Sequence, residues 1–279
     1  MIGPLVETDW LESQLGAEDL RLLDGSWYLP AMGRNARSEY AQGHIPGAVF
    51  FDIDAISDPF SPLPHMLPPP ESFAAAVGAL GIGDGDRIVV YDGAGLFSAA
   101  RVWWMFRAMG ARNVAVLNGG LGIWKAERRP LDTRPPAPAP KTFTPHPRPD
   151  WVRDLRAVKS LIDDGSACIV DARPQDRFSG AAPEPRPGLR SGHMPASRNT
   201  PIEMFLLSNG RLKPPAELVA AFEEAGVDLA QPIVTTCGSG ITAAIPFLAL
   251  TVLGKRDVAL YDGSWAQWGG LADATVEKG

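Results

Sequence analysis

The feature that most constrains the fold is that the chain carries one pattern of elements twice. The first copy reads "LRLLDGSWYL", "GHIPGAVFFDID", "PPPESFAAAVGALGI", "DRIVVYDG", "SAARVWWMFRAMG" and "VAVLNGGLGIW". The second copy reads "ACIVDARPQDRF", "SGHMPASRNTPIE", "PPAELVAAFEEAGV", "QPIVTTCG", "ITAAIPFLALTVLG" and "VALYDGSWAQW". Gly-His-x-Pro at 43–46 matches 192–195, and Trp124 matches Trp268. An internal duplication of this kind predicts two copies of one folding unit.

Each copy is predicted to be an α/β domain with a small parallel sheet flanked by helices. Short β-branched apolar runs, which suit strands buried on both faces, alternate with helical patterns. Gly110 and Gly254 stand where helix C-caps belong, just before the next strand. Between the copies, residues 129–150 carry eight prolines and no periodicity. We therefore expect a first domain over 1–133, a proline-rich linker over 134–150 and a second domain over 151–279.

Composition and charge exclude several classes of function. The 279 residues have a net charge of −6 and no basic block, which argues against nucleic acid as a partner. No apolar run approaches the ~20 residues that span a bilayer, and the N-terminus lacks the pattern of a signal peptide. We expect a cytoplasmic protein that does not bind membranes.

The two cysteines do not form a disulfide framework, and no cluster of Cys and His predicts a bound metal. Cys168, inside "ACIVDAR", is predicted to be a core residue of a strand.

Cys237 is placed differently, in the glycine-rich stretch "TTCGSGITAA" between a strand-like run and a helix. Ligands of open α/β sheets gather at the carboxyl ends of strands, which is where this cysteine falls. If Gly238 and Gly240 take positive φ, the N–H groups of residues 237–242 can converge on one point. Such a cradle, with a helix N-terminus behind it, stabilises a thiolate or an anionic persulfide. Ser239 and Thr242 add hydroxyl donors.

The first copy serves as an internal comparison, because Asp92 stands where the second copy has Cys237. An aspartate cannot carry sulfur, so the first copy is predicted to be catalytically silent. Pro246, early in the helix after the cysteine, predicts a local kink. A cysteine phosphatase requires Cys-x5-Arg, and that position is Ala243, which excludes this activity.

The duplication, the cysteine loop and "DGSWAQW" together resemble the rhodanese superfamily, in particular its two-domain sulfurtransferases. The resemblance runs over nearly the whole chain. It implies that Cys237 takes a sulfur atom from a donor, forms a persulfide and passes the sulfur to a nucleophile. No organic cofactor and no metal are implied.

The loop sequence favours one donor within that family. Thiosulfate-using members carry Arg and Lys in the loop, whereas Gly238 and Ser239 are neutral here. Cys-Gly-Ser-Gly-hydrophobic-Thr is similar to the 3-mercaptopyruvate sulfurtransferases, which implies donor contacts at Gly238, Gly240, Ile241 and Thr242. The donor's carboxylate then needs guanidinium groups outside the loop, and the resemblance assigns Arg177 and Arg186.

A proton relay is a further implication of the resemblance. Sulfur abstraction from mercaptopyruvate leaves the enolate of pyruvate, which must be protonated. By motif match, the relay consists of Ser239, His65 in "SPLPHMLPPP" and Asp54 in "FFDIDAIS". His65 would have to reach across from the first domain, and a structural role for it remains an alternative.

Several other residues are predicted to be structural. His44 and His193 recur before proline in both copies and should hold a turn, Arg190 should lie on the surface, and "RVWWMF" should form core and interdomain packing.

The predicted acceptors are thiols, such as thioredoxin or a small dithiol, and cyanide. Two alternatives remain open: a thiosulfate:cyanide sulfurtransferase, and a non-catalytic persulfide carrier in a sulfur relay.

Overall fold

The structure is a computed structural model that describes residues 2–279, and its chain divides into two compact units. The first unit comprises the residues up to Pro59, Leu67–Arg148 and Leu206–Leu212. The second unit comprises Phe60–Met66, Pro149–Phe205 and Lys213–Gly279. Each unit therefore contains one short segment from the other half of the sequence.

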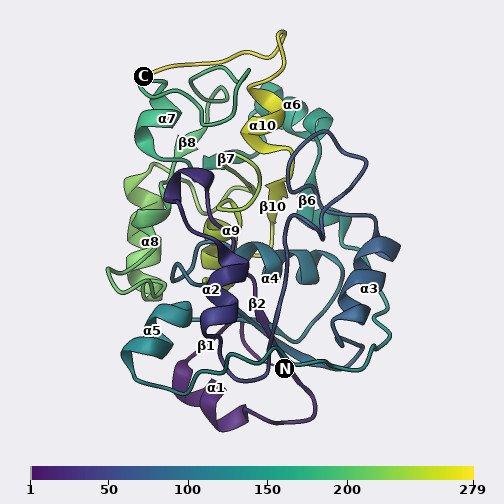
Figure 1. The fold of residues 1–279 in the computed structure, drawn as a ribbon. Helices are drawn as coiled ribbons and strands as arrows, with labels where there is room; N and C mark the ends of the chain where they lie inside the picture. Colours follow the sequence, from purple (N-terminus) through teal and green to yellow (C-terminus); the bar gives the residue numbers. More distant parts are fainter. Residues whose placement is uncertain (1) are drawn as a thin grey trace. The chain divides into compact units, whose positions relative to one another are not determined.

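The first unit is built on a five-stranded parallel sheet with the strand order β1-β5-β4-β2-β3. Strands β1 and β2 of this sheet are labelled in Figure 1. Its elements are β1 (Leu5–Val6), α1 (Thr8–Gln14), β2 (Leu20–Asp24), η1 (Pro30–Met32), α2 (Ala36–Gln42), β3 (Ala48–Phe50), α3 (Pro70–Ala79), β4 (Arg87–Tyr91), α4 (Ala99–Ala108), β5 (Val114–Leu117) and α5 (Gly120–Ala126).

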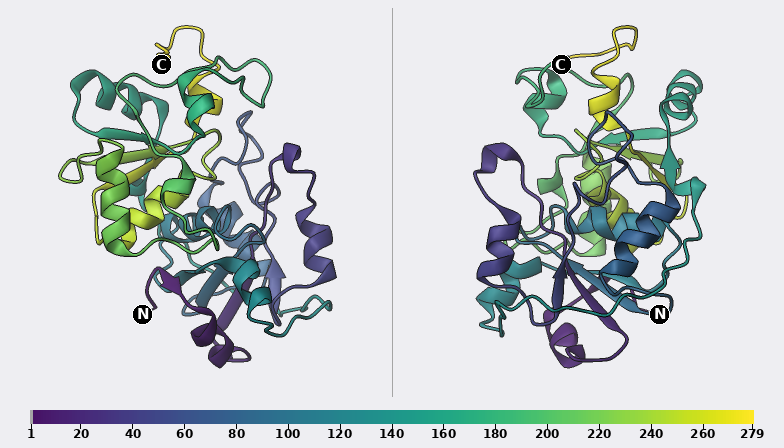
Figure 2. Two further views of the ribbon diagram at one scale, coloured as in Figure 1. Left: turned by 90° about the vertical axis from the view of Figure 1, so that its left-hand side faces the viewer. Right: turned by 45° about the vertical axis from the view of Figure 1, so that its right-hand side comes forward.

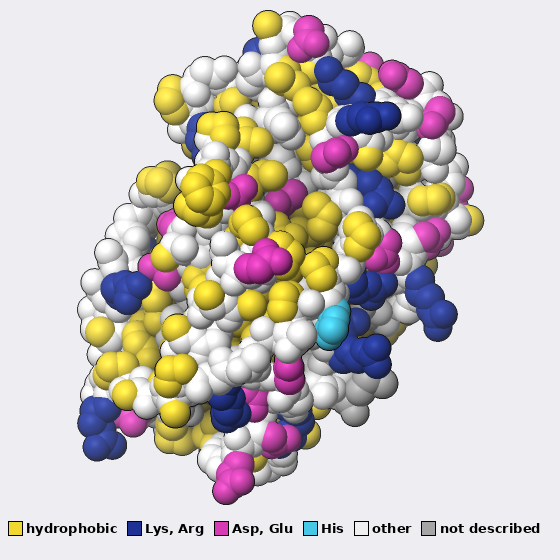
Figure 3. Space-filling model, turned by 90° about the vertical axis from the view of Figure 1, so that its right-hand side faces the viewer, with side chains coloured by type: hydrophobic (Ala, Val, Ile, Leu, Met, Phe, Trp, Pro, Cys, Tyr) yellow, Lys and Arg dark blue, Asp and Glu magenta, His cyan; other side chains and the backbone are white. Residues whose placement is uncertain are grey.

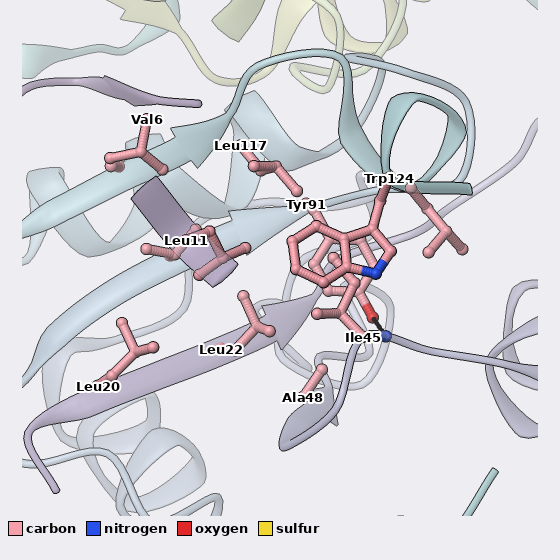
Figure 4. Packing of buried hydrophobic residues seen from close by; sticks show 12 residues of the cluster. Val6, Leu11, Leu20, Leu22, Ile45, Ala48, Tyr91, Leu117 and Trp124 are labelled. Atoms are coloured by element: carbon pink, nitrogen blue, oxygen red, sulfur yellow. Dashed lines mark hydrogen bonds between the residues drawn. The ribbon is translucent and has the colours of Figure 1, made fainter. Parts of the chain in front are cut away.

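The strands of the first unit bury both faces, as their continuous apolar runs predicted. On one face, Leu11 of α1 and Trp124 of α5 pack over Leu22 and Tyr91. Figure 4 shows the indole of Trp124 lying beside Tyr91 and Ile45, where the Tyr91 hydroxyl accepts the N–H of Ile45. Helix α4 contacts β4 and β5 and supplies the fully buried Trp103 and Trp104. The tryptophan-rich helix is thus core, as predicted.

The second unit repeats the architecture with the strand order β6-β10-β9-β7-β8, again all parallel. Its elements are η2 (Pro149–Trp151), β6 (Val152–Arg153), α6 (Leu155–Asp164), β7 (Cys168–Asp171), α7 (Gln175–Ser179), β8 (Arg198–Asn199), η3 (Ile202–Met204), α8 (Pro215–Glu224), β9 (Ile233–Thr236), α9 (Ala244–Val252), β10 (Val258–Tyr261) and α10 (Ser264–Trp268). The predicted fold class is confirmed in both units.

The core of the second unit follows the same plan. Val158 of α6 and Trp265 of α10 pack over Val234 and Tyr261, while α9 contacts β9 and β10. Figure 2 shows α8 in green and α10 in yellow within this unit. Central strand β9 ends at Thr236, so the candidate nucleophile, Cys237, is the first residue after the middle strand of this sheet.

The proline-rich segment packs on the first unit. The N–H of Lys141 donates to the carbonyl of Gly78 at 3.0 Å, and the N–H of His146 donates to Met109 at 2.8 Å. The Lys141 ammonium also pairs with Asp86 at 2.8 Å. These bonds explain how a stretch with eight prolines is held without regular secondary structure.

Two turn predictions are confirmed. Gly110 and Gly254 have φ of 91° and 81°, directly after the C-caps of α4 and α9. His44 and His193 each place Nδ1 2.9 Å from a backbone carbonyl, of Tyr40 and Phe178 respectively. The two rings also stack on Tyr40 and Phe178, so both histidines are structural.

Two other predictions were wrong. Pro246 is the third residue of α9, inside the first turn, where backbone N–H groups have no intrahelical acceptor, so it removes no bond and requires no kink. Arg190 is half-buried rather than on the surface, and its guanidinium donates to the carbonyls of Trp268, Gly269 and Ala274.

Cys168 begins β7 and is half-buried, and burial raises the pKa of its thiol. Within residues 2–279, no helix is long and apolar enough to cross a membrane. On the face shown in Figure 3, acidic and basic side chains lie among one another.

Candidate active site

The candidate site is the loop of residues 237–242, which joins β9 to α9 in the second unit. Cys237 is 2% exposed and Ser239 is 6% exposed, so both side chains are shielded from bulk water. Parallel strands direct their carboxyl ends toward one edge of the sheet, and Cys237 occupies that edge after the central strand.

The first turn of α10 holds the backbone of this loop. The Ser264 hydroxyl accepts the N–H of Cys237 at 3.2 Å. The N–H groups of Trp265 and Ala266 donate to the carbonyls of Cys237 and Gly238 at 2.9 and 2.8 Å. Ser264 does this from a φ of 48°, where the aligned residue of the first copy is Gly120 with a φ of 57°. A serine kept in a conformation that favours glycine indicates that its hydroxyl has a function.

The two glycines of the loop have different roles. Gly240 has a φ of 80°, as predicted. Gly238 does not take positive φ, so that part of the prediction was wrong. A Cβ at Gly238 would instead lie 3.0 Å from Nη2 of Arg177, which is closer than a side chain normally tolerates. Gly238 therefore permits the arginine to approach the backbone of the loop.

The first unit shows what this loop geometry does with an anion. Asp92 follows β4 as Cys237 follows β9, and its carboxylate accepts four backbone N–H groups at 2.7–2.9 Å. The donors are Ala94, Phe97, Ser98 and Ala99. By the alignment of the two copies, the corresponding N–H groups of the second unit belong to Ser239, Ile241, Thr242 and Ala243. A strand–loop–helix connection of this type is thus suited to one negative charge at the position after the strand.

Ser239 is the meeting point of two predicted site residues. Nδ1 of His65 lies 3.0 Å from the Ser239 hydroxyl, and Nη2 of Arg186 lies 3.4 Å from the same oxygen. The guanidinium can only donate, so the Ser239 oxygen accepts from Arg186, and the direction of the bond to His65 depends on the tautomer of the imidazole. His65 is 6% exposed and has a φ of 61°. Its segment, Phe60–Met66, comes from the first half of the sequence but belongs to the second unit, so His65 reaches the loop of the second half as expected.

Asp54 is described in the first unit, where its carboxylate oxygens lie 3.2 Å from the indole N–H of Trp27. The structure brings Ser239, His65, Arg177 and Arg186 together within one unit, and Asp54 is not part of that unit.

A buried carboxylate that the sequence did not single out holds Arg177. Glu184 accepts from Arg177 at 2.5 and 3.3 Å and from Arg173 at 2.8 Å, and its side chain is 1% exposed. Arg173 also pairs with Asp171 at 2.7 Å and lies 4.2 Å from the ring centre of Trp265. The glutamate between two prolines in "PEPRPG" was the available signal, because a charged residue in so constrained a stretch needs a partner.

Comparison with known proteins follows the same division of the chain. The model of the rhodanese-like domain matches residues 7–127 and again 154–271. The chain belongs to the rhodanese family. It contains two tandem rhodanese-like domains, and these matched ranges coincide with the two copies of the duplicated pattern.

Relatives are similar over nearly their full length. The chain is 45% identical over 270 residues to the human 3-mercaptopyruvate sulfurtransferase, covering 95% of this chain and 91% of that protein. It is 44% identical over 271 residues to the thiosulfate sulfurtransferase of Cricetulus griseus, with 95% and 91% covered. The crystal structure of SseA from Escherichia coli, described as a 3-mercaptopyruvate sulfotransferase with the rhodanese fold, superimposes with a TM-score of 0.87 at 40% identity, covering 95% of this chain and 99% of that one.

Proposed function

We propose that this protein is a sulfurtransferase that moves sulfur from 3-mercaptopyruvate to a thiol or cyanide through a persulfide on Cys237. In this proposal, the second repeat, residues 151–279, is catalytic and the first, residues 1–133, is not. The observation that carries it is the approach of two arginines to a loop that itself has no charge. Arg177 lies against Gly238, and Arg186 lies against Ser239.

In the first half-reaction, the Cys237 thiolate attacks the sulfur of the donor, whose carboxylate and carbonyl are held by Arg177 and Arg186. The carbon–sulfur bond breaks, and its electron pair goes to the carbon to give the enolate of pyruvate. Ser239, in contact with His65, delivers the proton that converts the enolate into pyruvate. Asp54 completes this relay in our proposal.

In the second half-reaction, an acceptor attacks the outer sulfur of the persulfide and releases the Cys237 thiolate. We infer that the N–H groups of Ile241 and Thr242 stabilise the anionic outer sulfur, by analogy with the donors to the Asp92 carboxylate in the first unit, and the family resemblance adds Gly238 and Gly240. Thioredoxin, a small dithiol and cyanide are the proposed acceptors, and the cytoplasm is the proposed location.

A comparison of donors tests the proposal. Initial rates with mercaptopyruvate and with thiosulfate, measured with cyanide as the acceptor, should favour mercaptopyruvate. Cys237→Ser should lose activity with both donors, whereas Cys168→Ser, the matched control, should keep it. Activity that survives Cys237→Ser would contradict the mechanism.

Thiosulfate as the main donor is the second candidate, because the relative from Cricetulus griseus carries that name at 44% identity. A higher kcat/KM with thiosulfate would establish it. A protein that accepts one sulfur per chain but does not turn over would instead be a persulfide carrier.

A further inference from the structure

The carboxylate of Glu184 is the strongest unexplained feature beside the cysteine loop. It is buried, and it bridges Arg173 and Arg177 with three contacts between 2.5 and 3.3 Å. Asp171 neutralises the other side of Arg173. The group therefore contains two guanidinium and two carboxylate charges, so the arginine that touches Gly238 brings no net charge with it.

We propose that Glu184 makes the site select its donor by charge. The carboxylate orients Arg177 toward the loop and also limits the positive potential there, so that a singly charged donor is preferred over a doubly charged one. This inference rests on the function proposed above. Mercaptopyruvate carries one negative charge and thiosulfate carries two. In a partly buried site, a fixed carboxylate opposes a dianion about twice as strongly as a monoanion.

The first unit provides an independent instance of the same arrangement. Arg34 donates to the carbonyl of Gly93 at 3.2 Å, and it is held by Glu39 at 2.5 and 2.8 Å. Gly93 follows Asp92 as Gly238 follows Cys237. There, a neutral arginine–glutamate pair stands beside a loop that contains a single negative charge, the Asp92 carboxylate. The second unit has the same pair beside the loop that would receive a monoanionic donor.

Glu184→Gln separates the two effects of the carboxylate, because glutamine keeps the shape and one acceptor oxygen but removes the charge. We expect the ratio of kcat/KM for thiosulfate to that for mercaptopyruvate to rise about tenfold. The KM for thiosulfate should fall while the KM for mercaptopyruvate rises or is unchanged. Glu184→Asp, which keeps the charge and shortens the side chain, should weaken both donors and leave the ratio near that of the wild type.

Glu217→Gln is the matched control, because Glu217 is exposed on α8 and the substitution changes the net charge equally. It should change neither rate. A merely structural role for Glu184 would lower both rates in parallel, and that result, or an unchanged ratio, would overturn the proposal.

A binding measurement that needs no turnover distinguishes this inference from the proposed function. Sulfate and pyruvate, a dianion and a monoanion, are titrated against the melting temperature of the wild type and of Glu184→Gln. For each protein, we compare the concentrations of sulfate and of pyruvate that raise the melting temperature by the same amount. The ratio of the sulfate to the pyruvate concentration should be about tenfold lower for the variant than for the wild type. If the wild type turns over neither donor but this selectivity appears, the proposed reaction is wrong and the charge effect stands. If the selectivity is absent, the charge effect is wrong whichever donor is used.

Discussion

The Ser239 hydroxyl contacts both Arg186, which is proposed to bind the donor, and His65, which is proposed to take part in protonating the enolate. The enolate must be protonated only in the first half-reaction, whereas the transfer from persulfide to cyanide needs no such proton. A residue that handles the proton should therefore affect one half-reaction and not the other.

Ser239→Ala is predicted to slow pyruvate release from mercaptopyruvate by about 10²-fold or more, the usual contribution of a positioned acid. Transfer of sulfur from the preloaded persulfide to cyanide should keep its rate. Single-turnover measurements of each half-reaction check this. Equal slowing of both would mean that Ser239 shapes the loop rather than moving a proton.

Asp24 gives the first unit a pH-dependent stability. Burial raises the pKa of this carboxyl to about 6, with the nearby Asp92 contributing in the same direction and Ser26 opposing it by hydrogen bonds. Because the folded state binds this proton more tightly than the unfolded chain, the stability contribution is complete below about pH 4 and is lost as pH rises to about 6.

The expected difference between the two limits is about 3 kcal/mol in the free energy of unfolding. Asp24→Asn should remove this dependence, so that the variant loses less stability than the wild type between pH 4.5 and 7. Urea titrations at several pH values measure it. Parallel curves for variant and wild type would show that Asp24 ionises normally.

At the scale of elements, the turn that begins α10 controls the cysteine loop. Ser264→Ala removes the acceptor of the Cys237 N–H while the positive φ persists, which should cost about 1–3 kcal/mol of stability. Ser264→Gly loses the same bond but relieves the backbone, so its cost should be smaller by about 1 kcal/mol. Denaturant titration of both variants measures the difference.

Ala196→Gly is the control for the backbone effect alone, because Ala196 is exposed and has a φ of 57°. It should stabilise the protein by about 1 kcal/mol. If Ser264→Gly is as harmful as Ser264→Ala while Ala196→Gly is stabilising, the Ser264 backbone is not strained.

The elements were largely predictable from the sequence, because strands buried on both faces and helices with one apolar face leave periodic patterns. The repeat doubled that signal, and both sheets have the same strand order. The conformation of single loop residues was less predictable: Gly238 serves the approach of Arg177, and a glycine in a sequence does not reveal whether it supplies positive φ or space.

Contacts between distant segments were the least predictable. Ser264 and Glu184 act through residues 27 and 7 positions away, by hydrogen bonds that leave no periodic trace. The resemblance pointed to the approach of His65 to Ser239, but only packing shows that the whole segment Phe60–Met66 belongs to the second unit.

At the scale of the whole molecule, the two units are predicted to unfold in one transition. The first unit includes Leu206–Leu212, where the N–H of Leu212 donates to Asn118 at 2.8 Å and Arg211 pairs with Glu127 at 3.1 Å. Each unit contains a segment that is covalently part of the other half of the sequence. When one half unfolds, it therefore withdraws packed residues from the unit formed mainly by the other half.

Calorimetry tests this coupling through one core substitution in each unit. Leu22→Ala and Val234→Ala remove buried side chains and should lower the same single melting transition. Two separate transitions, each sensitive to one substitution, would show that the exchanged segments do not couple the units.

The Asp92 carboxylate also explains how the loop after β4 keeps its shape although this repeat has no cysteine there. The aspartate at the position of Cys237 is itself an anion of suitable reach, and its carboxylate accepts four backbone N–H groups in the folded chain. A carboxylate at this position can thus keep such a loop folded in a repeat that lacks the cysteine, so that the loop needs no bound sulfur or other anion to hold its shape.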